Sequence, residues 1–154
     1  MLFLLFQLGE DRYALDAAQV MEVLPLVDVK QIPQAPAGVA GICNRRSAPL
    51  PVIDLSELTL GRPAARRLST RIIVVRCADG AGGVRELGLI AERATGMFRR
   101  EPADFVDAGI TNGRASYLGP VTTDERGLVQ RIDVDRLLPA SVREVLFASP
   151  VAER

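Results

Sequence analysis

Residues 39–55 have the sequence VAGICNRRSAPLPVIDL, in which two apolar runs flank the polar segment Asn44-Arg45-Arg46-Ser47. This pattern predicts a β-hairpin. Asn is favoured at the first position of a type I turn because its side chain bonds the backbone ahead of it, whereas the two central positions accept most residues. We therefore expect Arg45 and Arg46 to project from the tip of the hairpin.

Two prolines, Pro49 and Pro51, fall in the outgoing strand of this hairpin. Proline cannot donate to a strand ladder, so these positions predict an edge strand or the start of a bend. An edge strand is a ready docking surface for another protein. The alternative is a plain surface turn whose arginines only keep the protein soluble.

The composition bounds the fold and the partners. The chain has 154 residues, 48% of them hydrophobic, and 19 basic residues balance 19 acidic ones. This length allows one domain with a core, or two small barrels that share one. The balanced charge argues against a nucleic-acid binder, which normally carries a basic excess. Lys30 is the only lysine, and the arginines are spread along the whole chain, so we attribute their number to coding bias.

The sequence lacks the usual residues of catalysis and metal binding. Histidine is absent, which excludes Ser-His and Cys-His nucleophiles and most zinc sites. Cys43 and Cys77 do not form a C-x-x-C redox motif. The alternative is a disulfide between them, but cytosolic disulfides are uncommon, so we expect buried thiols. The acidic pair Asp133 and Asp135 faces no identifiable chemistry. We therefore predict no catalytic residue, no metal and no cofactor.

The N-terminus, MLFLLFQLG, is apolar but lacks the basic region and the cleavage site of a signal peptide. No apolar run approaches the roughly 18 residues that a membrane-spanning helix needs. These features predict a cytoplasmic protein.

Three short helices are expected from capping patterns, in which a side chain caps the helix and a residue three positions on reaches back. The pairs are Asp16 with Gln19, Asp54 with Glu57, and Ser141 with Glu144. Pro25 should end the first helix and leave Met21 and Glu22 exposed, and Gly61 should end the second. The inner face of the third is expected at Val142, Val145 and Leu146.

Strand patterns occupy most of the remaining chain. The segments are residues 2–8, 13–15, 26–32, 71–77, 86–92, 105–106, 117–121 and 128–134, and residues 94–98 continue the apolar character of 86–92. Residues 62–69 are rich in arginine and form the best candidate connection between two halves. The glycine-rich loop at 78–84 leads into a strand rather than a helix, so it does not predict a phosphate site. Many short strands at spacings of about 8 to 12 residues predict barrels or a sandwich.

Several sequence blocks follow one another in a characteristic order. The blocks are FLLFQLGEDRYALD, VMEVLP, IPQAPAGVAGICNRRSAPLPVIDL, RIIVV, LGLIAERATGMF, YLGPV and VDRLLP. This ordered set resembles the CheW family of bacterial chemosensory adaptors. VMEVLP resembles a helix of the family usually written V-x-E-I. The resemblance covers residues 2 to about 138, and its specificity lies in the ordered set rather than in any one block.

The resemblance implies a mainly β fold of two five-stranded SH3-like β-barrels packed together, with short helices including one near the C-terminus. It implies a single CheW-like domain at residues 1–149 with subdomains at about 9–66 and 70–140, and a tail at 150–154. Strand 2–8 would complete the second barrel.

The resemblance also implies a non-enzymatic adaptor that couples chemoreceptors, the methyl-accepting chemotaxis proteins, to a CheA-type histidine kinase. The regulatory domain of the kinase would bind Asn44, Arg45, Arg46 and Ser47, and Arg46 matches the motif arginine tied to kinase coupling. The cytoplasmic tip of the receptor would fill a groove near Val20, Glu22, Ile42, Ile90 and Ala94. Such a protein is cytoplasmic and is recruited to receptor arrays at the inner membrane.

Three residues depart from the family pattern. Arg45 stands where the family prefers Leu, Ser47 where it has Gly, and Leu24 where many members carry Arg. Glycine takes a left-handed conformation freely, whereas serine does so at a cost of about 1 kcal/mol. The altered turn suggests a different kinase surface and an alternative, non-flagellar chemosensory pathway.

Other interpretations stay open. The same domain could be the regulatory domain of a larger kinase or part of an adaptor–receiver protein, although the start at Met1 favours the free-standing form. A small barrel that binds nucleic acid would use Arg45, Arg46, Arg62, Arg66, Arg67 and Arg71. No aromatic residue interleaves with those arginines to stack bases. An exposed apolar groove could also pair two copies weakly.

Overall fold

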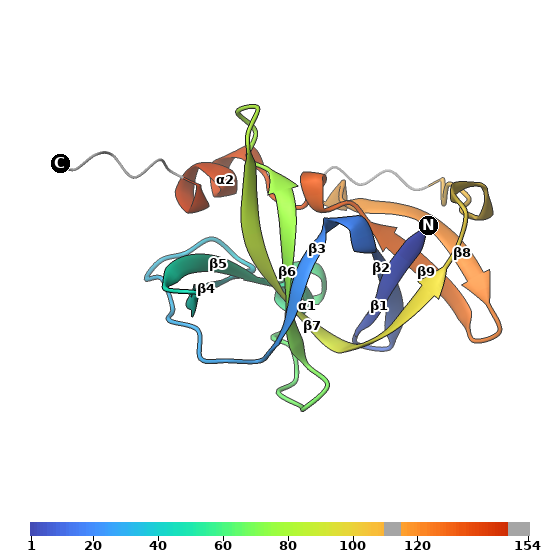
Figure 1. The fold of residues 1–154 in the computed structure, drawn as a ribbon, viewed down its shortest axis with the longest axis horizontal. Coiled ribbons are helices and arrows are strands. Elements are labelled where there is room, and N and C mark those ends of the chain that lie inside the picture. Colours follow the sequence, from blue (N-terminus) through green and yellow to red (C-terminus); the bar gives the residue numbers. More distant parts are fainter. Residues whose placement is uncertain (110–114, 148–154) are drawn as a thin grey trace.

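The computed structural model describes residues 1–109 and 115–147, except for the side chain of Thr95. Strands dominate the fold (Figure 1). They are β1 (Leu2–Leu8), β2 (Asp11–Asp16), β3 (Val20–Pro25), β4 (Val39–Arg45), β5 (Ala48–Asp54), β6 (Arg71–Ala78), β7 (Val84–Arg99), β8 (Leu118–Asp124) and β9 (Gly127–Ile132). The helices are α1 (Leu55–Leu60) and α2 (Ala140–Leu146), with 3₁₀ turns η1 (Ala17–Gln19), η2 (Pro102–Asp104) and η4 (Val134–Arg136).

The 16-residue strand β7 belongs to both halves of the molecule. Its first half pairs with β6 and with the end of β5, and its second half pairs with β1. One five-stranded unit therefore has the order β3-β6-β7-β5-β4, and the other has the order β7-β1-β2-β9-β8 (Figure 1). This arrangement confirms the expected mainly β fold of two barrel-like units.

The two barrels interleave in the sequence, unlike the subdomains expected at 9–66 and 70–140. β2 pairs in parallel with β9, and β6 pairs with β3, so the connection at 62–69 does not separate the barrels. β1 does lie with β2, β8 and β9. Strand pairing follows which apolar faces can be buried together, not distance along the chain.

Two core clusters explain why the strand RIIVV is apolar without alternation. Ile73 and Val75 belong to the largest cluster, whereas Ile72 and Val74 belong to a second cluster inside the β3–β6–β7–β5–β4 barrel. All four side chains are 0% exposed. Successive side chains of a strand point to opposite faces, so β6 is covered on both.

The prediction of a helix between Asp16 and Pro25 is wrong. The Oδ1 atom of Asp16 does accept the N–H of Ala18 at 2.9 Å, but only the single turn η1 follows. Residues 20–25 form β3 instead, which pairs with residues 71–75 of β6. Val20, Glu22 and Leu24 are half-buried and alternate with exposed residues, because the ladder with β6 outweighs the local capping signal.

Two of the expected strands are reduced to single bridges. Residues 26–32 form no regular strand and make only the bridge between Lys30 and Ile42, and residues 105–106 contribute only the bridge between Val106 and Val121. These segments lack a continuous partner strand, so a short apolar run does not become a ladder.

The third helix begins differently from the expectation. Pro139 is the N-cap of α2, and Ser141 lies inside the helix rather than capping it. Val142 and Leu146 pack against the core, but Val145 is exposed. Proline restricts the backbone at the entry to the helix by its own ring, so no side-chain cap is needed.

The capping pattern predicted for the helix after β5 is confirmed. The Oδ1 atom of Asp54 accepts the N–H groups of Ser56 and Glu57 at 3.0 and 3.2 Å, and Gly61 closes α1 with a left-handed φ of 78°. Residues 62–69 are an irregular connection, as expected. The tail expected at 150–154 lies outside the described residues.

Candidate interaction surfaces

The β4–β5 hairpin turns one position later than the sequence predicts. Arg45 still pairs with Ala48, so the loop consists of Arg46 and Ser47 alone. Both residues are left-handed, with φ of 53° and 67°. Two-residue hairpin loops favour this mirror-image turn because its twist matches that of the flanking strands. The type I turn centred on Arg45 and Arg46 is therefore wrong.

The register shift separates the roles of the two arginines. Arg46 lies at the tip and its side chain is 76% exposed, with one loose ion pair of 3.7 Å to Glu22. Arg45 is the last residue of β4, and its side chain is only 10% exposed. Arg46 can meet a partner directly, whereas Arg45 has little free surface.

Arg45 links three strands through its guanidinium group. Its Nε donates to Oε1 of Glu22 on β3 at 3.0 Å, and its Nη1 donates to Oε1 of Glu86 on β7 at 2.5 Å. A planar guanidinium suits two carboxylates at once because its donors point in fixed directions. The turn is thereby tied to both neighbouring elements.

The prolines protect an open strand edge beside the turn. Pro49 and Pro51 pair with Asn44 and Ile42 of β4, but β7 pairs only with residues 52–54 of β5. The expected edge therefore exists over the first half of β5 only. A hollow of about 470 Å³ lies beside this half, and Ile42, Arg45 and Phe147 contribute to its lining.

The five residues expected to form the receptor groove do not line one surface. Ile90 and Ala94 are 7% and 4% exposed and lie in core clusters. Val20 and Glu22 are half-buried on β3, and Ile42 is half-buried on β4. The structure brings Glu22 together with Arg45 and Arg46 instead.

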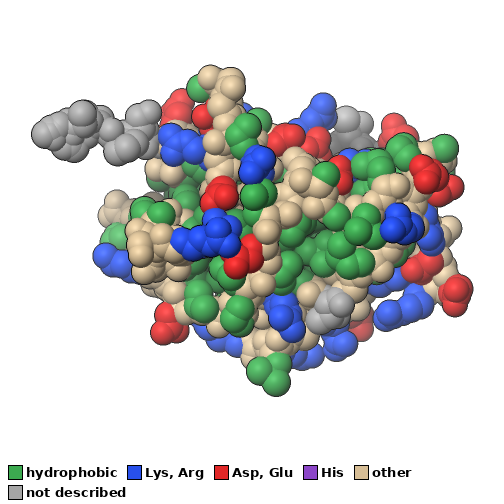
Figure 2. Space-filling model, in the orientation of Figure 1, with side chains coloured by type: hydrophobic (Ala, Val, Ile, Leu, Met, Phe, Trp, Pro, Cys, Tyr) green, Lys and Arg blue, Asp and Glu red, His purple; other side chains and the backbone are tan. Residues whose placement is uncertain are grey.

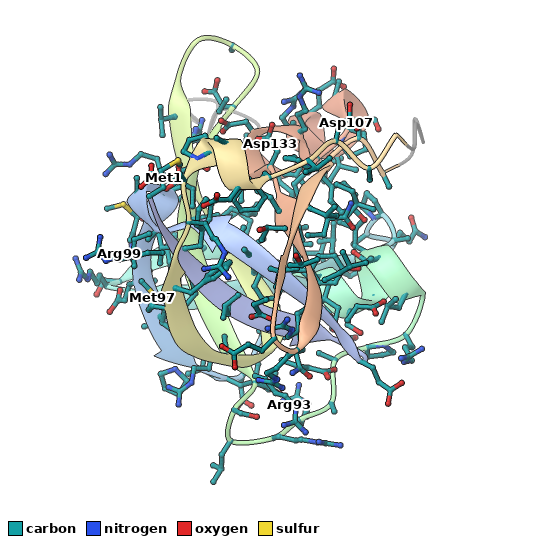
Figure 3. The ribbon with its side chains drawn as sticks, turned by 90° about the vertical axis from the view of Figure 1, so that its right-hand side faces the viewer. Met1, Arg93, Met97, Arg99, Asp107 and Asp133 are labelled. Atoms are coloured by element: carbon teal, nitrogen blue, oxygen red, sulfur yellow. The ribbon has the colours of Figure 1, made fainter. Side chains whose placement is uncertain are left out.

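An exposed apolar face was not predicted as a set. We define the apolar face as Leu2 on β1, Met21 and Val23 on β3, and Met97 on β7, all large hydrophobic residues that are more than a third exposed. Figure 2 shows hydrophobic side chains gathered in the region of β3 and β1, and Figure 3 shows Met97 on the corresponding side of the molecule. The alternation of 21 and 23 would have revealed this face if residues 20–25 had been treated as a strand.

Two buried thiols and the ion pair between Arg12 and Asp124 lie outside the turn at Arg46 and Ser47. Cys43 and Cys77 are free and buried, and burial raises the pKa of the Cys77 thiol to about 11. Both terminal guanidinium nitrogens of Arg12, Nη1 and Nη2, donate to the carboxylate of Asp124, which holds the pKa of that carboxyl below its usual range. This pair joins β2 to the end of β8, in the barrel that does not contain the turn.

Metal-binding and membrane-spanning features are absent from the described residues. No group of three or more His, Cys, Asp and Glu side chains there is placed to hold a metal ion. None of the helices in that part of the chain is long and apolar enough to cross a membrane.

Comparison with known proteins identifies the family. A family model described as a CheW-like domain matches residues 2–142. The chain belongs to the CheW-like family. Chemotaxis protein CheW of Treponema pallidum is 50% identical over 52 residues, which are 34% of this chain and 31% of that protein. Chemotaxis protein CheW of Thermotoga maritima is 28% identical over 135 residues, or 86% of this chain and 84% of that protein.

A solved structure from the same family shares the fold. The scaffolding protein TtCheW of Thermoanaerobacter tengcongensis superposes with a TM-score of 0.78 at 22% identity, covering 92% of this chain and 89% of that one. The similarity therefore extends over both barrels of this CheW-like chain.

Proposed function

We propose that this CheW-like chain is a non-enzymatic adaptor that couples chemoreceptors to a CheA-type histidine kinase. The match of the family model to residues 2–142 carries the proposal. The exposed features support it, because an arginine-tipped turn and an apolar face suit protein–protein contacts rather than chemistry. Its attachment to receptors would bring the chain to arrays at the inner membrane.

Arg46 is the proposed centre of the kinase contact. It is the exposed residue of the turn that matches the family's motif arginine, and Asn44 and Ser47 flank it on the exposed side of the hairpin. Arginine is enriched among residues that dominate interfaces, since it combines a charged fork with an apolar stem. The regulatory domain of the kinase would therefore meet Asn44, Arg46 and Ser47, and Arg45 would support them from below.

The apolar face is the proposed receptor surface. The cytoplasmic tip of a chemoreceptor is a helical hairpin, and a helix docks through apolar anchors on one side. Met21 and Met97 suit such a surface because methionine is flexible and polarizable. Val20 and Glu22, which the family resemblance placed in the groove, lie on the same strand as Met21 and Val23 but point to its opposite, half-buried side.

Binding to a purified kinase regulatory domain tests the turn. Arg46→Glu should weaken the affinity at least about tenfold, as expected for a dominant interface residue. Arg67→Glu is the matched control, because Arg67 is an exposed arginine in the connection after α1. Equal affinity of the folded Arg46→Glu protein and the wild type would refute the assignment.

Binding to a receptor hairpin fragment tests the apolar face. Met97→Asp should weaken this binding about tenfold, because it buries a charge against a helix. Leu128→Asp on β9 introduces the same charge at a similarly exposed apolar site and should have no effect. Loss of receptor binding in both variants would show that the apolar face is not the specific surface.

A further inference from the structure

Arg45 is a nearly buried cation at the root of the exposed turn. Its side chain is 10% exposed, and it contacts Glu22 on β3 and Glu86 on β7 from its own position on β4. The two carboxylates remain 33% and 41% exposed, so both still reach water. Of the three charged groups, the guanidinium of Arg45 is therefore the most buried, and it pairs with both carboxylates.

The turn that follows Arg45 holds two residues in an unfavourable conformation. Arg46 and Ser47 have φ of 53° and 67°, a region in which residues with a Cβ atom are disfavoured. Such conformations persist when surrounding contacts over-determine them. Because neither residue is a glycine, contacts around the turn have to offset this cost.

Glu22 is shared unequally between the two arginines. Its Oε1 atom lies 3.0 Å from Nε of Arg45 and 3.7 Å from Nη2 of Arg46. The first is a hydrogen-bonded ion pair at a largely enclosed guanidinium, whereas the second is a loose pair to an exposed one. Arg45 thus occupies the carboxylate that pairs with Arg46 and leaves Arg46 turned to solvent.

We propose that Arg45 is a positioning residue. Its ion pairs with Glu22 and Glu86 stabilise the left-handed turn and thereby present Arg46 to the kinase. The presentation of Arg46 to a kinase rests on the proposed function, but the stabilisation of the turn by Arg45 does not. This role explains why a second arginine is present in the hairpin without adding free surface.

Solution NMR of the free protein tests whether Arg45 stabilises the turn. In the wild type, the Cα chemical shifts and backbone couplings of residues 46 and 47 should indicate the left-handed region. Arg45→Met, which keeps most of the length of the side chain without its charge, should shift them toward averaged values. Arg12→Met is the matched control, because it breaks a partly buried arginine–carboxylate pair in the other barrel and should leave both residues unchanged.

Kinase binding tests the presentation of Arg46. Arg45→Met should weaken affinity for the kinase regulatory domain by about tenfold in the wild type, but less than about twofold in an Arg46→Ala background. Arg45→Lys should recover only part of the affinity, since an ammonium group cannot span both carboxylates as a fork. A purely structural role would lower the melting temperature without this dependence on Arg46.

Distinct outcomes overturn distinct steps. Unchanged NMR signals at residues 46 and 47 in Arg45→Met would show that Arg45 does not stabilise the turn. Equal losses of kinase affinity in the wild type and in the Arg46→Ala background would show that Arg45 contacts the kinase directly. If Arg45→Met does not fold, the double variant Glu22→Gln with Glu86→Gln removes the same ion pairs and must show the same changes. If Arg46→Glu binds the kinase normally, the proposed function fails at this site, while the NMR result still decides the role of Arg45.

Discussion

At the scale of single residues, Arg45 and Arg46 show how adjacent identical side chains acquire different roles. The register of the hairpin places Arg45 at the end of β4, where it pairs with two carboxylates. Arg46, the next residue, lies in the two-residue loop. The sequence indicated a hairpin with an arginine at its tip, and that much is confirmed. It could not show which arginine is exposed, because that depends on Glu22 and Glu86, 23 and 41 positions away.

The ion pair of Arg12 with Asp124 should make stability depend on pH in a defined direction. The pKa of Asp124 is lowered in the folded state, so its contribution is fully present above the ordinary carboxyl pKa of about 4. It is lost as pH falls through the lowered folded value. We expect Asp124→Asn to cost about 1–2 kcal/mol of unfolding free energy at pH 7, and less below pH 4.

Urea unfolding at several pH values measures this contribution. Glu125→Gln is the control, since it is an exposed acid next to Asp124 and should change the unfolding free energy by less than about 0.5 kcal/mol. A deficit of Asp124→Asn that grows as pH falls below 4 would contradict the expected direction.

Cys77 should react slowly with thiol reagents in the folded protein. Its side chain is 3% exposed, and burial with nearby Asp135 raises its pKa to about 11, so little thiolate forms near neutral pH. Labelling with a disulfide reagent should become fast only in denaturant. Ser141→Cys, at an exposed position near the start of α2, supplies a thiol that should react at once under native conditions. Rapid labelling of Cys77 in the native wild type would disprove its enclosure.

At the scale of elements, local signals were reliable where local contacts decide the structure. Asp54 and Gly61 bound α1 as their types predict. The same reasoning failed for residues 20–25, where the ladder with β6 outweighs a capped start and helical spacing. The partner strand β6 lies about 50 residues further along the chain, so nothing near residue 20 reveals that a ladder will form.

Gly41 is the element-scale position that should tolerate substitution least. It has a φ of 144°, and a Cβ atom there would lie 1.9 Å from the backbone oxygen of Lys30, which pairs with Ile42. Gly41→Ala should therefore break the bridge between the 26–37 segment and β4 and cost several kcal/mol, roughly 2–4. Thermal unfolding measures the loss.

Gly96→Ala in β7 is the matched control for Gly41. The added Cβ atom would make only ordinary contacts with Leu5 at 3.8 Å and beyond. It should change the melting temperature by a few degrees at most. Equal losses in the two variants would show that the close approach of Lys30 to Gly41 is not what requires glycine.

At the scale of the whole molecule, β7 is the feature that joins two barrels into one body. Because one strand of 16 residues serves both sheets, neither barrel closes without it. The sequence predicted two small barrels but divided them at the connection 62–69. That division was wrong because a change in composition indicates a loop, and the chain can return to the same barrel after a loop. The arginine-tipped turn and the apolar face use different residues, and their proposed partners differ.

Simultaneous binding of two proteins is the most direct test of the adaptor. The purified chain is mixed with a kinase regulatory domain and a receptor hairpin fragment, and complexes are resolved by size-exclusion chromatography with light scattering. We predict a ternary complex, with Arg46→Glu losing only the kinase and Met97→Asp losing only the receptor fragment. Competition of the two proteins for the chain, or loss of both partners in either variant, would contradict the adaptor role.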